Sequence, residues 1–354
     1  MPQIQADRLT EFATQLLRAG GVGVDAAGVD EARLVAESLV AANLRGHDSH
    51  GAMRIPYYLD GVQKGEVVPG VPLTVLNEEA SILVADGHWG FGQTQARRLT
   101  GKLIDKARAT GVAVGTLIHS AHVGRLGEYC EQAAEAGLVS MMMVNTHGTA
   151  RRVAPVGGIA PRLGTNPLAI GVPDAGGALI LDFGTSATAE GKVRVKKIGG
   201  QLCPDGWLLD SNGEPTNDPN KLYADPPGTI LPMGGDQAYK GFGLALMVEI
   251  FAGALSGGIC AREKPLNQLG NCVFLQLLDP GHLGGAGHFR EQVTGLIEFV
   301  RSCPTRGGAG EIFLPGDPER KMLAQRTVEG IPFDDGNWRQ LAELAGRLKV
   351  AVPE

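Results

Sequence analysis

Two stripes of apolar residues recur at helical spacing in the first 45 positions: Leu9, Phe12, Leu16 and Leu17, then Leu34, Val35, Leu39 and Ala42. An apolar residue every three or four positions is typical of a helix that buries one side. Asp7 and Asp25 stand where each stripe begins, so we expect them to cap the two helices. The first helix should end before Gly20-Gly21 and the second near Arg45-Gly46.

From residue 71 onward the pattern changes to short β-branched runs that alternate with helical stretches. A hairpin is predicted over 71–85, and further strands over 112–118, 138–145, 168–172, 179–183, 272–278 and 311–314. Helices are predicted over 93–110, 124–136, 187–197, 240–256 and 289–302, with two more at the C-terminal end. Such alternation is typical of the α/β class.

The order of these elements predicts a sheet-based body and a smaller helical unit built from both chain ends. We expect an N-terminal helical segment over 1–70, the α/β body over 71–315, and C-terminal helices over 316–354 that pack with the N-terminal segment. The Pro-, Gly- and Asn-rich stretch 199–237 is too long for an ordinary loop, and long irregular segments are usually functional.

Composition narrows the class of protein further. The chain has 354 residues, 43% hydrophobic and 20% charged, with a net charge of −6, which argues against binding to nucleic acid or to an anionic membrane. The five cysteines include no C-x-x-C pair and are expected to be reduced thiols. Neither a signal peptide nor an apolar run of membrane-spanning length is visible. We therefore expect a cytoplasmic protein.

Several common motifs are missing. Gly90-Phe91-Gly92 and Gly285-Ala286-Gly287 both lack the third glycine of the dinucleotide fingerprint G-x-G-x-x-G. Gly191-Lys192 lacks the rest of a Walker A loop, and neither H-E-x-x-H nor G-x-S-x-G occurs. If the chain binds a nicotinamide coenzyme, it does so on a fold other than the doubly wound one.

The segment 48–55 carries the most suggestive chemistry. His50 directly follows Ser49, and Arg54 stands four positions further on. An imidazole can give or take a proton near neutral pH, and a guanidinium can hold a carboxylate with two parallel hydrogen bonds. Together they suit proton transfer at C2 of a small 2-hydroxy or 2-oxo acid. The alternative is that His50 caps a helix end and Arg54 is solvated.

A second histidine cluster, residues 119–127, follows a predicted strand and opens a helix. Ligands of α/β sheets bind at such strand ends, so His122 is a candidate for proton transfer or substrate polarisation, and Gly124 would let a ligand approach the backbone. Zinc is a rival hypothesis, because His47/His50 and His119/His122 are both i,i+3 pairs, although no cysteine or carboxylate stands at ligand spacing. A histidine hydrogen-bonded at a helix N-terminus is the third possibility.

Other residues indicate a binding site only when they are considered together with the two histidine segments. Thr165 and Asn166 could hydrogen-bond a ligand or simply build a turn. Asp182 ends a buried apolar run and needs a partner such as a ribose hydroxyl or a backbone donor. Lys240 could meet a phosphate or be solvated, and Asp317 could be only a helix N-cap.

These blocks together resemble the malate/L-lactate dehydrogenase family, which lacks a Rossmann fold. The resemblance rests on residues 48–58, His122-Val-Gly, residues 163–167 and 181–186, Lys240-Gly-Phe-Gly243 and Leu314-Pro-Gly316. Residues 42–51 and 207–216 are most similar to the hydroxycarboxylate dehydrogenases of that family. The resemblance implies a mixed-sheet, non-Rossmann NAD(P)-binding α/β fold and a homodimer with its active site at or near the subunit interface.

The resemblance also implies roles. His50 would be the acid in reduction and the base in oxidation, His122 would be catalytic or polarise the substrate, and Arg54 would hold the substrate carboxylate, with Ser49, Thr165 and Asn166 as further substrate contacts. Cofactor contacts are implied for His50, Gly124, Arg125, Leu126, Thr146, Ile180, Leu181, Asp182, Phe183, Gly184, Tyr239, Lys240, Asn271, Pro315, Gly316, Asp317 and Pro318. No metal site is expected.

Some positions depart from the family pattern. Asp317, Pro318 and Tyr239 replace residues common in relatives, and Arg151-Arg152 makes one segment more basic. These arginines could meet a second substrate carboxylate or an NADP phosphate, and solvation is the preferred interpretation.

We expect hydride transfer between NAD or NADP, with NAD slightly favoured, and C2 of a small 2-hydroxy acid. Reduction of a cyclic imino acid is the alternative activity, and a ligand-binding protein without catalysis is the third reading.

Overall fold

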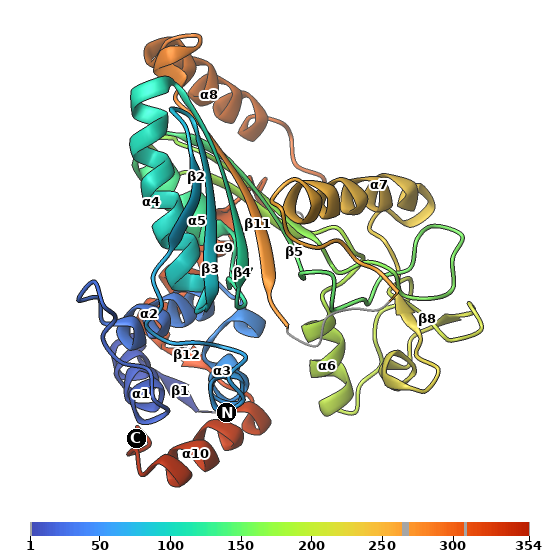
Figure 1. Cartoon of the computed structure of the whole chain (residues 1–354). Helices are drawn as coiled ribbons and strands as arrows, with labels where there is room; N and C mark the ends of the chain where they lie inside the picture. The colour runs from blue at the N-terminus through green and yellow to red at the C-terminus, as the bar shows by residue number, and fades with distance from the viewer. Residues whose placement is uncertain (1, 264–268, 308–309, 354) are drawn as a thin grey trace.

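A computed structural model, which describes residues 2–263, 269–307 and 310–353, is organised around one seven-stranded sheet (Figure 1). Its strands are β2 (Thr74–Glu78), β3 (Ile82–Gly90), β4 (Val112–Ser120), β5 (Val139–Asn145), β6 (Pro167–Val172), β7 (Leu179–Gly184) and β11 (Asn271–Leu278). The order is β2-β3-β4-β11-β5-β6-β7. Only the β3–β4 pair is parallel, which confirms the expected mixed sheet.

The strand directions gather many loops at one edge of this sheet. Because β4 and β5 both pair antiparallel with β11, they run in the same direction, and β7 shares it. The carboxyl ends of β4, β5 and β7 therefore lie at the same edge as the amino ends of β6 and β11. We call this the site edge. Ligands of α/β sheets commonly bind where strand ends and loops converge.

The two faces of the sheet are covered by different helices. In β11, Val273, Leu275 and Leu277 belong to a buried cluster with α4 (Gly92–Thr110) and α5 (Gly127–Glu135). Phe274, on the opposite face, packs edge-on against Phe251, which belongs to the π-helical turn Ile250–Ala254 that continues α7 (Ala238–Glu249). Because side chains alternate along a strand, β11 is buried on both sides, and its sequence reads as a continuous apolar run.

The stretch 199–237 contributes short elements rather than one irregular loop. The strands β8 (Leu208–Leu209), β9 (Pro215–Thr216) and β10 (Thr229–Ile230) form a small sheet. This sheet shares a buried cluster with α6 (Glu190–Ile198), and Figure 1 places both beside the main sheet. Val153 bridges Leu163 and Ile230, so residues 151–163 are anchored to this unit.

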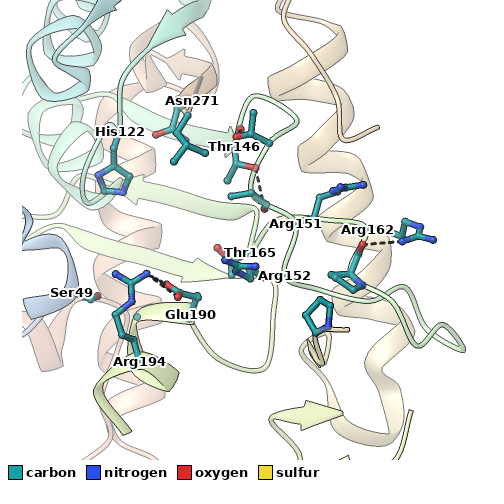
Figure 2. Close-up of a pocket in the computed structure, with 18 of the residues that line it drawn as sticks. Ser49, His122, Thr146, Arg151, Arg152, Arg162, Thr165, Glu190, Arg194 and Asn271 are labelled. Atoms are coloured by element: carbon teal, nitrogen blue, oxygen red, sulfur yellow. Dashed lines mark hydrogen bonds and ion pairs between the residues drawn. The ribbon is translucent and has the colours of Figure 1, made fainter. Parts of the chain in front are cut away.

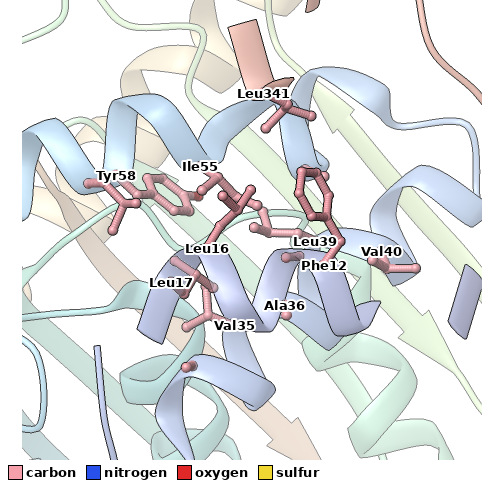
Figure 3. Close-up of a cluster of buried hydrophobic side chains, with 14 of the residues drawn as sticks. Phe12, Leu16, Leu17, Val35, Ala36, Leu39, Val40, Ile55, Tyr58 and Leu341 are labelled. Carbon is pink, nitrogen blue, oxygen red and sulfur yellow. The ribbon is translucent and has the colours of Figure 1, made fainter. Parts of the chain in front are cut away.

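Helices from both chain ends share one buried cluster. The helices α1 (Ala6–Ala19), α2 (Glu31–Leu44), α3 (Ile55–Gln63) and α10 (Asp335–Leu348) share one buried cluster, and β1 (Gln3–Ile4) pairs with β12 (Ile331–Pro332). Figure 3 shows Leu16, Leu39 and Ile55 together with Leu341 in this cluster. Two further helices are α8 (Ala286–Arg301) and α9 (Asp317–Glu329). The short helices are Asp48–His50, Ala52–Arg54, Pro219–Tyr223, Gly235–Gln237 and Pro280–His282.

Three local predictions are wrong. Asp30, and not Asp25, caps α2 by accepting from Arg33 N, while Asp25 closes its own turn and pairs with Arg98. Gln5 occupies the N-cap position of α1, and Asp7 lies in the first turn. Residues 311–314 form no strand, because the Leu314 N–H bonds the side chain of Asp317 instead of a neighbouring strand.

The helix α3 was not predicted, and it begins directly after the segment that carries His50 and Arg54. Among the described residues, no helix combines the length and the apolar content needed to span a bilayer.

Candidate active site

Two large cavities meet at His50 and His122. One has a volume of about 850 Å³ and the other about 860 Å³. Both are lined by Ser49, His50, His122, Thr146, Thr165, Ala189, Gly191 and Asn271. The first, which we call the arginine-rich cavity, extends past Arg54 and residues 149–152. The second, the sheet-edge cavity, extends along residues 123–126 and 182–184.

The turn that carries His50 is held by α2. The Asn43 side chain accepts a hydrogen bond from Ala52 N (2.8 Å) and donates one to Asp48 Oδ1 (2.7 Å). A Cβ atom at Gly51 would lie 2.2 Å from Asn43 Oδ1, so glycine is what lets the amide approach this closely. Arg326 of α9 pairs with the same Asp48 at 2.7 Å. The turn is therefore held by side chains of α2, from the N-terminal part of the chain, and of α9, from the C-terminal part.

Within this turn, three side chains are linked. Ser49 Oγ lies 3.1 Å from His50 Nδ1, and Arg54 Nε donates to the carbonyl oxygen of Ser49 at 2.7 Å. Arg54 also lines the arginine-rich cavity. The guanidinium thus braces the backbone next to His50 and faces the same space as the imidazole.

His122 comes from the loop after β4 and is oriented by two buried side chains. Its Nδ1 lies 2.8 Å from Tyr58 Oη, and that oxygen accepts a hydrogen bond from Gln93 Nε2 at 2.8 Å. The rings of His50 and His122 stack with centroids 5.4 Å apart and planes 23° apart. The two predicted histidines are therefore adjacent in space.

Asn271, at the start of β11, ties the site edge together. Its Oδ1 accepts from Val123 N (2.9 Å) and its Nδ2 donates to Asn145 O (2.8 Å). Val123 follows His122 in the loop after β4, and Asn145 is the last residue of β5, directly before Thr146. Asn271 lines both cavities, but its amide is already used to join their walls.

Both histidines are uncharged near neutral pH. Burial, together with the positive charge of Arg54, lowers the pKa of His50 to about 3 and that of His122 well below its usual value. A neutral imidazole can accept a proton from a substrate hydroxyl and can donate a hydrogen bond to a carbonyl oxygen.

The sheet-edge cavity combines three carboxylates, Asp48, Asp182 and Glu319, with several cations. Asp182 Oδ2 accepts from Gly127 N (2.7 Å) at the start of α5, and burial raises the pKa of this carboxyl. The cations that line the cavity are Arg45, Arg125, Lys192 and Lys196. Arg125 is buried and pairs with Glu131 at 2.6 Å. Such a wall suits an anionic ligand that also carries hydroxyl groups.

The residues expected to contact a cofactor divide into two groups. In the walls of the sheet-edge cavity lie His50, Gly124, Arg125, Leu126, Thr146, Asp182, Phe183, Gly184, Asn271 and Pro318. Outside them lie Ile180, Leu181, Tyr239, Lys240, Pro315, Gly316 and Asp317. Ile180 and Gly316 line a smaller adjoining cavity of about 210 Å³, which shares Arg45, Arg125 and Glu319 with the larger one.

The remaining residues of the second group either bond another group of the protein or are exposed to solvent. Asp317 bonds Arg301 and Arg320, and Pro315 O accepts from Ile180 N. Tyr239 and Lys240 are exposed at the start of α7, the tyrosine with 57% of its surface accessible. Within one copy of the chain they lie outside the site.

Asn166, one of the expected substrate contacts, takes part in a buried network. It is fully buried, and its Nδ2 donates to Ala245 O (2.9 Å) and to Glu249 Oε2 (2.7 Å). It therefore fastens the start of β6 to α7 instead of lining a cavity. The neighbouring Thr165 lines both cavities.

One histidine of each pair considered for zinc lies against a carboxylate from another part of the chain. His47 Nε2 lies 3.3 Å from Glu319 Oε1, and His119 Nδ1 lies 2.9 Å from Asp86 Oδ2. Within residues 2–263, 269–307 and 310–353, no three His, Cys, Asp or Glu side chains are grouped to hold a metal ion.

Of the residues that line the arginine-rich cavity, Arg151 and Arg152 were named from the sequence, but Arg162, Glu190 and Arg194 were not. Figure 2 shows Arg152, Arg162, Arg194 and Glu190 in the arginine-rich cavity. Glu190 accepts from Arg194 (2.9 Å) and from Tyr223 Oη (2.8 Å). The basic segment 151–152 was a usable signal, whereas nothing in the sequence placed α6 against the cavity.

Comparison with known proteins identifies the family. A family model described as malate/L-lactate dehydrogenase matches residues 4–342. The chain is 36% identical over 329 residues to hydroxycarboxylate dehydrogenase B of Escherichia coli (strain K12), which covers 92% of this chain and 89% of that protein.

Solved structures match over nearly the whole chain as well. Malate dehydrogenase from Pyrococcus horikoshii OT3 superposes with a TM-score of 0.88 at 31% identity, covering 99% of this chain and 97% of that one. The Δ1-piperideine-2-carboxylate reductase from Pseudomonas syringae pvar. tomato gives 0.82 at 31% identity, covering 98% and 100%. The fold is therefore that of a known group of enzymes.

Proposed function

For a chain that belongs to the malate/L-lactate dehydrogenase family, and is thus a nicotinamide-dependent oxidoreductase of 2-hydroxy acids, we propose that His50 and His122 handle the proton at the C2 oxygen. The observation that carries this proposal is the stacking of their rings at the junction of the two cavities. One cavity would hold the coenzyme and the other the acid, so that the reacting carbon lies between them.

The sheet-edge cavity is the proposed coenzyme site. Its volume of about 860 Å³ lies within the ordinary range of ligand pockets. The diphosphate of the coenzyme would face Arg45, Lys192 and Lys196. Asp182 uses one carboxylate oxygen to bond Gly127 N, and its other oxygen would accept a hydrogen bond from a ribose hydroxyl. The bound coenzyme supplies or accepts the hydride. NAD remains the expected preference over NADP.

The substrate would bind between Arg54 and the histidines. Arg54 would hold the C1 carboxylate, since its terminal nitrogens can form a bidentate pair. Tyr58 Oη already accepts from Gln93, so its own proton is available to His122 Nδ1. That hydrogen bond leaves the proton of neutral His122 on Nε2, which would polarise the C2 oxygen. His50 would then take the hydroxyl proton during oxidation and return it during reduction.

The test is a matrix of initial rates for several 2-oxo acids and piperideine-2-carboxylate with NADH and with NADPH, for the wild type and for His50→Ala and His122→Ala. We expect turnover of 2-oxo acids, and a loss of about 10²–10⁴-fold in kcat for His50→Ala with coenzyme binding retained. Near-normal turnover by His50→Ala would remove it from the mechanism. Turnover of the imine alone would instead identify an imino acid reductase.

The assembly proposed for the chain is a homodimer. None of the 16 residues of α8 is buried, and Leu296 and Phe299 expose 61% and 77% of their surfaces. In Figure 1 this helix projects from the end of the sheet opposite the chain termini. Since large exposed apolar side chains usually mark contact surfaces, a second copy is the proposed occupant. Light scattering of the wild type should give a mass of two chains, and the Phe299→Asp variant should give a mass closer to that of one chain. A wild type with the mass of one chain would refute the dimer.

A further inference from the structure

The arginine-rich cavity is larger and more positive than a small monocarboxylic acid requires. A three- or four-carbon acid displaces on the order of 100 Å³, the liquid volume of three or four waters, whereas this cavity measures about 850 Å³. Among the described residues that line it are five arginines, Arg54, Arg151, Arg152, Arg162 and Arg194, and a single carboxylate, Glu190. The two histidines add no positive charge, because burial keeps them neutral.

Most of these arginines already have partners. Arg54 bonds Ser49 O, Arg151 bonds Arg262 O (3.1 Å), Arg162 bonds Pro161 O (3.1 Å), and Arg194 pairs with Glu190. In the part of the chain that the structure describes, the Arg152 guanidinium has neither a hydrogen bond nor an ion pair. Glu190, the single carboxylate among the described residues of that wall, is close enough to interact with the charge of Arg152, but it bonds Arg194 and Tyr223. A half-buried cation of this kind is favourably placed for an anionic ligand.

The backbone holds Arg152 in place. Its N–H donates to Leu163 O (2.8 Å), and its carbonyl oxygen accepts from Ile230 N (2.8 Å) and from Thr229 Oγ1 (3.0 Å). The next residue, Val153, is fully buried between the same two segments. Arg152 is therefore presented from a fixed backbone and not from a free loop, so an ion that binds it need not order the chain first.

Resting on the function proposed above, we propose that the substrate carries a second anionic group, a carboxylate, sulfonate or phosphate, and that Arg152 binds it. Arg54 would hold the C1 carboxylate beside the histidines, and in Figure 2 Arg152 lies between His122 and the outer pair Arg151 and Arg162. A coenzyme phosphate is the less suitable ligand, because Arg152 lines the arginine-rich cavity and is absent from the walls of the sheet-edge cavity.

The first test compares 2-oxo acids of equal chain length with and without a terminal carboxylate: oxaloacetate against 2-oxobutyrate, 2-oxoglutarate against 2-oxopentanoate, and 2-oxoadipate against 2-oxohexanoate. The wild type should prefer the dianion in at least one pair by about 10- to 100-fold in kcat/KM, and the preference should shrink with added salt. 3-Sulfopyruvate and 3-phosphonopyruvate then distinguish the kinds of anion. Preference for the monoanion at every length would overturn the proposal.

The second test uses Arg152→Gln, with Arg108→Gln on the exposed end of α4 as a control that makes the same change in net charge. Arg152→Gln should remove most of the dianion preference by raising KM for the dianion far more than for the monoanion, and a melting temperature equal to that of Arg108→Gln would show that it folds. Arg152→Lys should recover part of the preference for the dianion, since lysine keeps the positive charge but lacks the planar guanidinium that can form two parallel hydrogen bonds. Equal losses for both acids would contradict the proposal.

The two proposals fail differently. Turnover of monoanions without any dianion preference would overturn the second anion site and leave the dehydrogenase assignment intact. Absence of turnover for every acid with both coenzymes would overturn the function itself.

Discussion

His50 and His122 stack ring against ring at 5.4 Å, although one belongs to the turn before α3 and the other to the loop after β4. Burial most of all, and then the charge of Arg54, lowers the pKa of both imidazoles, and the nearby His50 further disfavours protonation of His122. The pair can therefore carry one proton far more readily than two. This is the state required of a site that takes one proton from a hydroxyl group and later returns it.

The pH dependence of alcohol oxidation should reflect this. Oxidation needs neutral His50 as the base, and in the free protein its pKa is about 3, so the base form is present throughout the neutral range. We expect kcat/KM for a 2-hydroxy acid to show no loss from His50 protonation between pH 8 and about pH 5. In the pH profile of kcat, the fall in rate on the acid side should occur at higher pH than in the profile of kcat/KM. The reason is that the substrate carboxylate bound to Arg54 offsets the positive charge of that residue. A tenfold fall in kcat/KM per unit below pH 6.5 would contradict this.

Tyr58→Phe should damage catalysis more than binding. The substitution removes the hydroxyl that bonds His122 Nδ1 and keeps the ring that packs on Phe91. His122 could then adopt the other tautomer, with its proton turned away from the substrate. We expect kcat to fall by about 10-fold, with little change in KM. A changed acid limb in the pH profile would support the tautomer explanation, and a pure rise in KM would refute it.

Arg54 variants should separate charge from geometry. Arg54→Gln removes both the charge and the guanidinium geometry, and we expect its KM for a 2-oxo acid to be about 100-fold higher than that of the wild type. Arg54→Lys keeps the charge, and its KM should be about 10-fold higher. The dissociation constant for NADH, measured by fluorescence, should hardly change, because Arg54 lines only the arginine-rich cavity. Unchanged KM values would show that another group holds the carboxylate.

Asn43 and Gly51 should be energetically coupled. Asn43→Ala leaves the Ala52 N–H without its partner and should cost about 1–3 kcal/mol in the free energy of unfolding. Gly51→Ala in the wild type should also destabilise, because its Cβ would overlap the Asn43 amide. In the Asn43→Ala background the same substitution should cost much less. Urea denaturation of the four variants measures the coupling, and simple additivity would rule out the contact as its cause.

Sequence reasoning succeeded where a local pattern carries the information. The helical spacing of Leu9 to Leu17 and the apolar run 272–278 led to elements that the structure contains, and His50, His122 and Arg54 stood out by their chemistry and spacing. It failed where the outcome depends on a distant partner. Asp25 was assigned as a cap but pairs with Arg98, and 311–314 was assigned as a strand but has no strand beside it.

By itself, the sequence determined which residue types are present and which stretches bury one side or both, and this was enough for the α/β class and for a resemblance to a dehydrogenase family. Only the tertiary structure decided that β4 and β5 end at the edge where β11 begins, and that Asn271 bonds there to Val123, in the loop after β4, and to Asn145, the last residue of β5. It also decided that, among the described residues, the Arg152 guanidinium has neither a hydrogen bond nor an ion pair. The physical reason is that periodicity reports burial within one element, whereas a cavity is formed by residues far apart in the chain, whose distances are set by strand pairing and packing.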